Sequence, residues 1–209
     1  MASLVAAGVL FVLTLSGNDG YSGPGTVTTF STPIDLTIFA TPTAPPSEAP
    51  IAELAIPRFD ITAPVVIRGV DAQGVMETPD GPTDVAWYDF TARPGFGSNA
   101  VFSGHVDYIN YGPAVFYNLK DLEAEDIIEV RLQDGTVYRY GVKEREQIAA
   151  AEADVGKIVG PSEAEIITLI TCGGIFDPSV GQYDQRVIVR AQRVYEAPPG
   201  PAAGADAAP

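Results

Sequence analysis

The sequence is poor in the residues that carry most metal and redox chemistry. Among 209 residues it has one cysteine, Cys172, and one histidine, His105. A single cysteine excludes an internal disulfide and a cluster of metal-binding thiolates. Basic residues are also scarce, since 12 Lys and Arg stand against 27 Asp and Glu for a formal net charge of −15. Because such a charge repels phosphate backbones, we expect no nucleic-acid partner.

Charged residues are absent from residues 2–15, ASLVAAGVLFVLTL. This run is shorter than the roughly 20 residues of a comfortable bilayer span, but it is typical of an export signal or a membrane anchor. A buried core helix is the alternative interpretation. We therefore expect residues 1–15 to act as a signal or anchor segment, which would hold an extracellular domain at the cell membrane.

The rest of the chain divides by composition. Residues 16–50 are rich in Pro, Thr and Gly and resemble an extended stalk. Residues 197–209 form a Pro/Ala/Gly tail that we expect to be disordered. The folded domain is therefore predicted to span residues 51–196.

Within this domain, alternating and apolar runs are short and are separated by turn residues. In residues 126–132 and 136–142, apolar side chains recur at every second position on either side of Asp134-Gly135, which predicts a β-hairpin. Further strands are predicted at 63–67, 100–103, 165–172 and 186–191, and helical turns only at 118–125 and 161–164. Many strands with few helices indicate an all-β barrel or sandwich.

Three residues whose side chains can take part in catalysis lie at predicted strand ends. Cys172 ends one strand, His105 follows another after a single glycine, and Arg186 opens a third. If the strands of Cys172 and Arg186 are antiparallel neighbours, both residues lie at one rim, and residues 173–185 form an active-site loop. A thiolate attacks carbonyl carbon, an imidazole accepts the thiol proton, and a guanidinium stabilises the oxyanion. Together the three residues predict a thiol acyl-transfer site.

Each residue alone has a simpler interpretation. A free cysteine is often a small buried apolar residue, and a lone histidine is often structural. Arg186 could be a strand-surface charge, as we expect for Arg190. Asp107 either orients His105 or caps a turn. The coincidence of all three groups, with glycines next to both the cysteine and the histidine, favours the catalytic interpretation.

Two stretches resemble the signature motifs of sortases, the cysteine transpeptidases of Gram-positive cell surfaces. Residues 168–172, TLITC, match the TLxTC signature that holds the sortase cysteine, and residues 102–107, FSGHVD, resemble the histidine motif. Arg186 precedes a strand in the place of the family arginine, and residues 56–65 are similar to the N-terminal strand pair. The resemblance covers residues 51–194.

The subclass is indicated by residues 173–174 after the cysteine and residues 87–88 ahead of the histidine strand. Both are most similar to class E and class F sortases. In class F sequences the arginine lies nearer a Gly-x-Tyr element, at the place of Asp184 here. Since no Arg or Lys lies between Cys172 and Arg186, Arg186 is the matching cation.

The resemblance implies a closed β-barrel of eight strands with short helical turns and a groove on its wall. It implies that Cys172 cleaves an LPxTG-like sorting motif on surface proteins through a thioacyl-enzyme, with His105 as acid and base and Arg186 at the oxyanion. The acceptor would be an amine of a peptidoglycan precursor or a pilin lysine. Substrate or oxyanion contacts are further expected from Thr171, Gly173 and Gly174.

Two other functions stay open. An L,D-transpeptidase-like cross-linker also uses cysteine and histidine, but its cysteine is soon followed by arginine, whereas Cys172 is followed by Gly-Gly-Ile-Phe. A non-catalytic extracellular β-barrel that binds protein or glycan would leave the coincidence of Cys, His and Arg unexplained. We expect no cofactor and no metal, because the carboxylates of Glu123, Glu125 and Asp126 read as a solvated turn.

Overall fold

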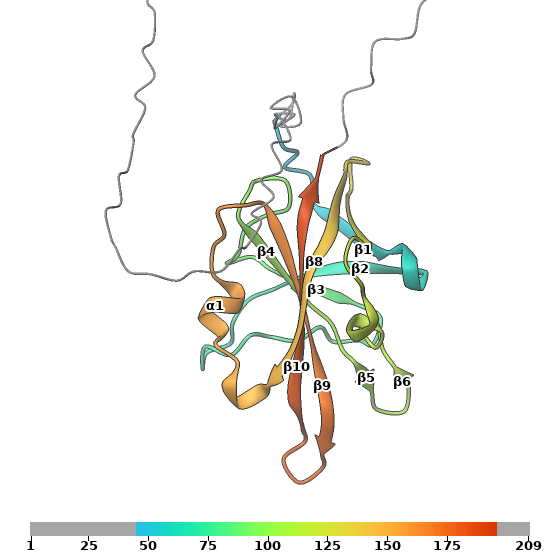
Figure 1. The fold of residues 1–209 in the computed structure, drawn as a ribbon, viewed down its shortest axis with the longest axis vertical. Coiled ribbons are helices and arrows are strands. Elements are labelled where there is room, and N and C mark those ends of the chain that lie inside the picture. The colour runs from blue at the N-terminus through green and yellow to red at the C-terminus, as the bar shows by residue number, and fades with distance from the viewer. Residues whose placement is uncertain (1–44, 196–209) are drawn as a thin grey trace, which may run out of the picture. The chain divides into compact units, whose positions relative to one another are not determined.

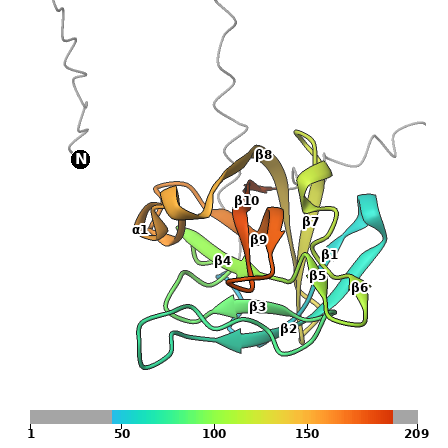
Figure 2. The same ribbon diagram turned by 90° about the horizontal axis from the view of Figure 1, so that it is seen from below.

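The computed structural model describes residues 45–195. The predicted segment 1–15, stalk residues 16–44 and the tail 197–209 lie outside the described residues. The described chain forms a closed barrel with the strand order β1-β2-β3-β4-β9-β10-β8-β7 (Figures 1 and 2). The prediction of an all-β fold with a closed eight-stranded barrel and short helical turns is therefore confirmed.

The elements have the following bounds. The barrel strands are β1 (Ile51–Ile56), β2 (Ile61–Arg68), β3 (Val85–Tyr88), β4 (Asn99–Ser103), β7 (Ile127–Leu132), β8 (Val137–Ala149), β9 (Ile166–Asp177) and β10 (Gln182–Val194). A separate small pair is formed by β5 (Asp107–Tyr108) and β6 (Gly112–Pro113). The helical pieces are η2 (Pro57–Phe59), η3 (Leu119–Asp121), η4 (Ala150–Glu152) and α1 (Val155–Val159).

The β7–β8 hairpin forms as its alternating pattern predicts. Ile128 pairs with Tyr140 and Val130 with Tyr138, and all four side chains are buried in the core. Gly135 has a φ of 88°, a backbone conformation that glycine adopts without steric cost, so the turn needs this residue. The hairpin thus supplies one wall of the apolar barrel interior.

Parallel pairing of β4 with β9 brings two distant segments together. Val101 pairs with Thr168 and Ser103 with Ile170. Two residues beyond this last pair, the chain reaches His105 on one side and Cys172 on the other. The register of this ladder therefore delivers both residues to the same end of the barrel.

The β9–β10 hairpin is longer than its pattern predicted. Both strands continue past Cys172 and Arg186, which lie directly opposite each other within the ladder. The prediction of a loop over residues 173–185 is therefore wrong, since only the four residues 178–181 join the strands. A β-bulge at Gly174, whose φ is 79°, lets the ladder continue through the glycine pair.

One predicted helical turn is wrong and another is confirmed. Residues 118–125 contain η3, but residues 161–164 contain no helix. The helix α1 lies just before residues 161–164. Its start is set by Asp154, whose side chain caps the helix by accepting a hydrogen bond from the backbone N–H of Lys157. In Figure 2, α1 lies on one side of the β9–β10 hairpin, and β5 and β6 lie on the other.

Candidate active site

The three predicted site residues line one groove. His105, Cys172 and Arg186 contribute to a cavity of about 620 Å³ at the end of the barrel. Its remaining wall is largely apolar and includes Val75, Met76, Val155, Ile158, Val159 and Ile170. Such a wall suits an extended peptide with apolar side chains.

Cys172 is half-buried in the middle of β9 and is a free thiol. Burial raises the pKa of this thiol above its ordinary value, the cationic Arg186 lowers it, and the carboxylate of Asp107 raises it. Since burial is the largest of these effects, the resting side chain is a neutral thiol. Cys172 therefore needs a proton acceptor before it can act as a nucleophile.

The backbone just before His105 is tied to the strand of Cys172. Gly104 donates its N–H to the carbonyl of Ile170 at 3.2 Å and accepts the hydroxyl proton of Thr171 at 2.8 Å. A Cβ at position 104 would lie 2.8 Å from side-chain atoms of both Val115 and Phe116. The glycine is thus required by close packing, and it delivers His105 in a defined position.

The tautomer of His105 is set by one contact. Its Nε2 lies 2.8 Å from the carbonyl oxygen of Pro79, and its ring packs edge-on against Tyr108 at 5.3 Å between centroids. Because a carbonyl oxygen only accepts, this hydrogen bond requires a proton on Nε2, and in the neutral ring Nδ1 is then the acceptor. The imidazole is thereby prepared to take a proton from a thiol.

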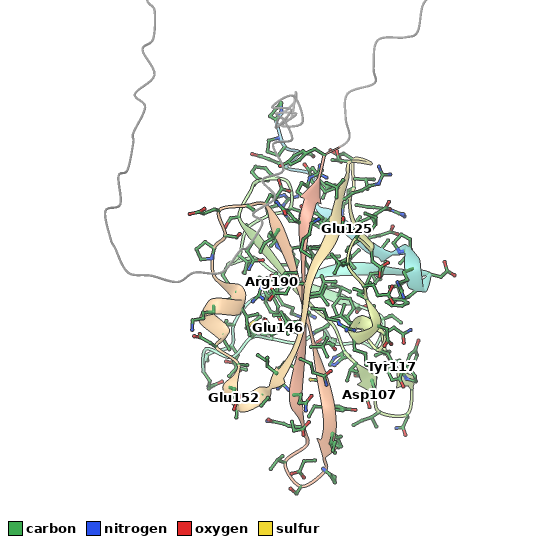
Figure 3. The ribbon with its side chains drawn as sticks, in the orientation of Figure 1. Asp107, Tyr117, Glu125, Glu146, Glu152 and Arg190 are labelled. Carbon is green, nitrogen blue, oxygen red and sulfur yellow. The ribbon has the colours of Figure 1, made fainter. Side chains whose placement is uncertain are left out.

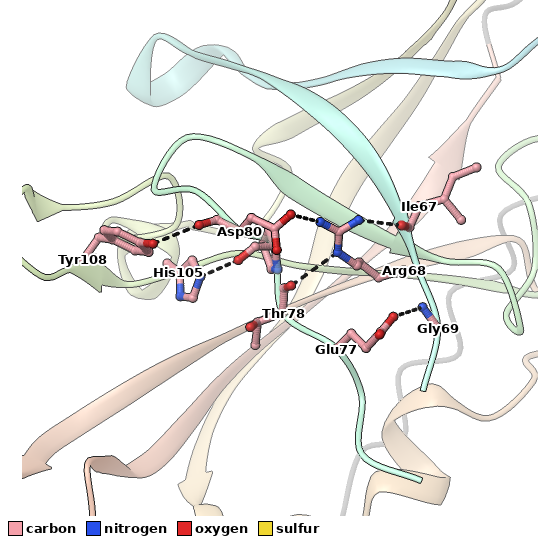
Figure 4. A network of polar contacts seen from close by, with 9 residues as sticks. Ile67, Arg68, Gly69, Glu77, Thr78, Asp80, His105 and Tyr108 are labelled. Atoms are coloured by element: carbon pink, nitrogen blue, oxygen red, sulfur yellow. Dashed lines mark hydrogen bonds and ion pairs between the residues drawn. The ribbon is translucent and has the colours of Figure 1, made fainter. Parts of the chain in front are cut away.

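The segment that carries Pro79 is itself held in place (Figure 4). Arg68 at the end of β2 contacts Asp80 Oδ2 at 2.6 Å and donates to the carbonyl of Thr78 at 3.4 Å. Tyr108 donates its hydroxyl proton to the carbonyl of Asp80 at 2.9 Å. Sequence reasoning missed this support because Arg68, Thr78 and Asp80 lie far from His105 along the chain and carry no recognisable motif, although Tyr108 is only three residues away.

Arg186 keeps free hydrogen-bond donors. Its Nη1 donates to the carbonyls of Tyr183 at 3.1 Å and Gln185 at 2.8 Å. Its Nε and Nη2 make no hydrogen bond within residues 45–195. The guanidinium is therefore anchored at one end, and its other donors are available to a carbonyl or oxyanion in the groove.

Contacts within the domain explain why threonine occurs at position 171 and glycine at positions 173 and 174. Thr171 is 4% exposed, and its hydroxyl proton is used by the Gly104 carbonyl. A Cβ on Gly173 would lie 2.9 Å from Cγ2 of Val187, and Gly174 occupies the bulge. Their contacts with substrate stay a prediction.

Asp107 neither orients His105 nor caps a turn within the described chain. Its Oδ2 instead accepts a hydrogen bond from the hydroxyl of Tyr183 at 2.6 Å, which links β5 to β10. This contact raises the pKa of Tyr183 to about 12, with burial adding to the effect. The link joins two segments that are 76 residues apart, so the sequence held no local signal of it.

The acidic turn holds ion pairs. Glu123 and Asp126 both contact Arg58 at 3.0 Å, and Glu125 contacts Lys143 at 2.6 Å. Residues 45–195 contain no group of three or more side chains that could hold a metal ion. No helix in this range is long and apolar enough to cross a membrane.

Comparisons with known proteins agree with this geometry. The sortase domain model matches residues 54–194. Sortase A from Corynebacterium diphtheriae, solved as a lid mutant, is 28% identical with a TM-score of 0.54, and the match covers 74% of this chain and 75% of that one. Sortase C-3 from Streptococcus pneumoniae is 25% identical with a TM-score of 0.51, over 73% of this chain and 65% of that one.

A third structure is similar in fold. Sortase C-1 from Actinomyces oris is 22% identical with a TM-score of 0.53, over 70% of this chain and 74% of that one. A search of curated proteins gives no significant match. The assignment to class E or class F stays a prediction. Because the family model spans more than half of the sequence and the described residues build its barrel, the chain belongs to the sortase family of cysteine transpeptidases.

Proposed function

We propose that this sortase cleaves an LPxTG-like sorting motif through a thioacyl-enzyme on Cys172 and transfers the acyl group to an amine. The observation that carries the proposal is that one groove holds the chain's only thiol, its only imidazole and a guanidinium with free donors. The apolar wall of the same groove suits the Leu and Pro side chains of such a motif.

In the first half of the reaction, Nδ1 of His105 takes the proton from Sγ of Cys172. The thiolate attacks the carbonyl carbon of the motif's threonine, and the guanidinium of Arg186 donates to the oxyanion. The C–N bond to glycine then breaks, and the imidazolium returns its proton to the leaving amine. The product is a thioester between Cys172 and the acyl fragment.

The cellular setting is also part of the proposal. Residues 1–15 would anchor the protein so that the catalytic domain lies outside the cell membrane. The acyl donors would be surface proteins that carry a sorting signal, and the acceptor would be a peptidoglycan precursor or a pilin lysine. Sortase membership supports this reading over the L,D-transpeptidase and binding-module alternatives.

The proposal is tested by incubating the protein with a panel of sorting-motif peptides and amines, followed by mass spectrometry. We expect peptide cleavage, an acyl adduct on Cys172 and an amide product. Cys172→Ala should abolish all three, and His105→Ala should lose at least about 10²-fold in rate, as is typical of removing an acid–base group. Cys172→Ala turnover within about tenfold of wild type would refute the assignment.

A further inference from the structure

A second, smaller groove lies against the reactive thiol. It has a volume of about 240 Å³ and is lined by Thr171, Cys172, Gly173 and Gly174 on β9 and by residues of other segments that include Asp107, Tyr117, Lys120 and Tyr183. Neither His105 nor Arg186 lines it. Figure 3 shows Asp107 and Tyr117 on one side of the β9–β10 hairpin and Glu152 of η4, next to the larger groove, on the other. Cys172 is therefore reached from two sides.

The smaller groove carries a negative charge that forms no ion pair with a cation of residues 45–195. The carboxylate of Asp107 is exposed, and it forms no ion pair within residues 45–195. Lys120, the one basic residue of this lining, is instead paired with Asp121 at 2.7 Å and lies over the ring of Tyr117 at 5.6 Å. A cationic ligand would thus find an available carboxylate here.

This carboxylate is fixed and lies near the reacting sulfur. Tyr183 donates its hydroxyl proton to Oδ2 of Asp107 at 2.6 Å, and its ring packs against Phe176 at 5.2 Å between centroids. The Asp107 charge also acts on the thiol of Cys172, whose pKa it raises. Oδ1 of Asp107 makes no hydrogen bond to the described chain, so it is available to a ligand.

We propose that the smaller groove admits the acceptor amine and that Asp107 binds its ammonium group. The inference rests on the proposed function, because it assigns the second substrate of that reaction. The larger apolar groove would then hold the acyl peptide, so that donor and acceptor approach the thioester from opposite sides of the hairpin.

In the second half of the reaction, the acyl group passes from Cys172 to the amine. The ammonium loses one proton to solvent, its nitrogen forms a C–N bond with the thioester carbon, and the C–S bond to Cys172 breaks. A second proton leaves the nitrogen through His105 and ends on the thiolate of Cys172. The products are an amide and the free thiol, and Asp107 is unchanged.

The test compares Asp107→Asn with the wild-type protein across acceptors. The amide oxygen of asparagine can still accept from Tyr183, so this change removes charge with little loss of structure. For ammonium acceptors we expect the KM to rise about fivefold, the size of an exposed ion pair, with kcat at saturating amine nearly retained. For hydroxylamine, which is largely uncharged at neutral pH, we expect no change in KM. The rise should shrink at high salt.

Two variants serve as controls. Asp177→Asn removes the same charge near the tip of the same hairpin, outside both grooves, and should match the wild type. Tyr183→Phe breaks the hydrogen bond but keeps the Asp107 carboxylate, so a structural role of this contact would appear in Tyr183→Phe and a charge role only in Asp107→Asn.

The acceptors should include a peptide with N-terminal glycine, a lysine ε-amine peptide and diaminopimelate, so that the largest dependence on Asp107 identifies the source of the amine. Equal KM changes in Asp107→Asn and Asp177→Asn, or equal changes for hydroxylamine and ammonium acceptors, would overturn the inference alone. Absence of any acyl adduct on Cys172 in the wild type would overturn the proposed function, and the inference with it.

Discussion

Replacing Thr171 by valine is expected to damage both the stability and the catalysis of this protein. The two side chains have nearly the same shape, but valine lacks the hydroxyl that donates to the carbonyl of Gly104 at 2.8 Å. Thr171 is 4% exposed, so water cannot easily replace the lost donor. The bond also fixes the residue that precedes His105.

The expected magnitude follows from this geometry. Leaving a buried acceptor without its partner costs about 1–3 kcal/mol in the free energy of unfolding. At about 2 kcal/mol, the unfolding midpoint of a domain of this size should fall by roughly 4–8 °C. A displaced imidazole should further lower kcat by about 10- to 100-fold, since misplacement by an ångström is costly in catalysis.

Thr168→Val is the matched control. Thr168 lies on the same strand, is fully buried and donates its hydroxyl proton to Asn99 at 2.8 Å, but it does not line the groove. We expect a similar loss of stability in both variants by thermal unfolding, and a loss of kcat only in Thr171→Val. Thr171→Ser, which keeps the hydroxyl, should recover most of the activity.

If Thr171→Val and Thr168→Val lose the same fraction of kcat under conditions in which both proteins are folded, Thr171 does not position His105. If Thr171→Val unfolds at the wild-type temperature, the buried hydrogen bond contributes nothing to stability.

The remaining predictions concern the thiol, the guanidinium and the start of the domain. Because burial raises the thiol pKa and Arg186 lowers it, alkylation of Cys172 should accelerate only above the ordinary thiol range near pH ~8.5. In Arg186→Gln this rise should move to still higher pH, and an unchanged profile would contradict the electrostatic coupling. Arg186→Lys should lose about 10²–10³-fold in kcat, since an ammonium group lacks the planar fork of donors that a guanidinium has. Arg190→Lys should leave kcat nearly unchanged in the same assay, because Arg190 lines neither groove. Equal effects of the two lysine substitutions would remove Arg186 from the mechanism. A chain that starts at residue 51 should fold, but its unfolding midpoint should lie roughly 4–8 °C below that of a chain that starts at residue 45. The reason is that residues 45–50 form hydrogen bonds with Tyr138 and Gln133 of the barrel. Identical unfolding curves would show that this segment does not contribute to stability.

The sequence by itself determined the features that depend on near neighbours in the chain. The alternation around Asp134-Gly135 predicted the β7–β8 hairpin, because side-chain direction in a strand repeats every two residues. The motif around Cys172 and the one around His105 identified the family, since both are short and contiguous. The glycines after the cysteine and before the histidine singled out both residues as site candidates, and the structure shows close packing at Gly104 and Gly173.

Only the tertiary structure decided how these pieces meet. The parallel ladder of β4 with β9, the carbonyl of Pro79 that sets the His105 tautomer, and the contact of Tyr183 with Asp107 all join residues that are distant along the chain. The sequence did not predict that the β9–β10 hairpin continues past Gly174, because a bulge preserves strand pairing where the local pattern is typical of a loop. The second groove was also invisible in the sequence, since its lining comes from separate segments whose proximity follows from barrel closure, and closure is a property of all eight strands together.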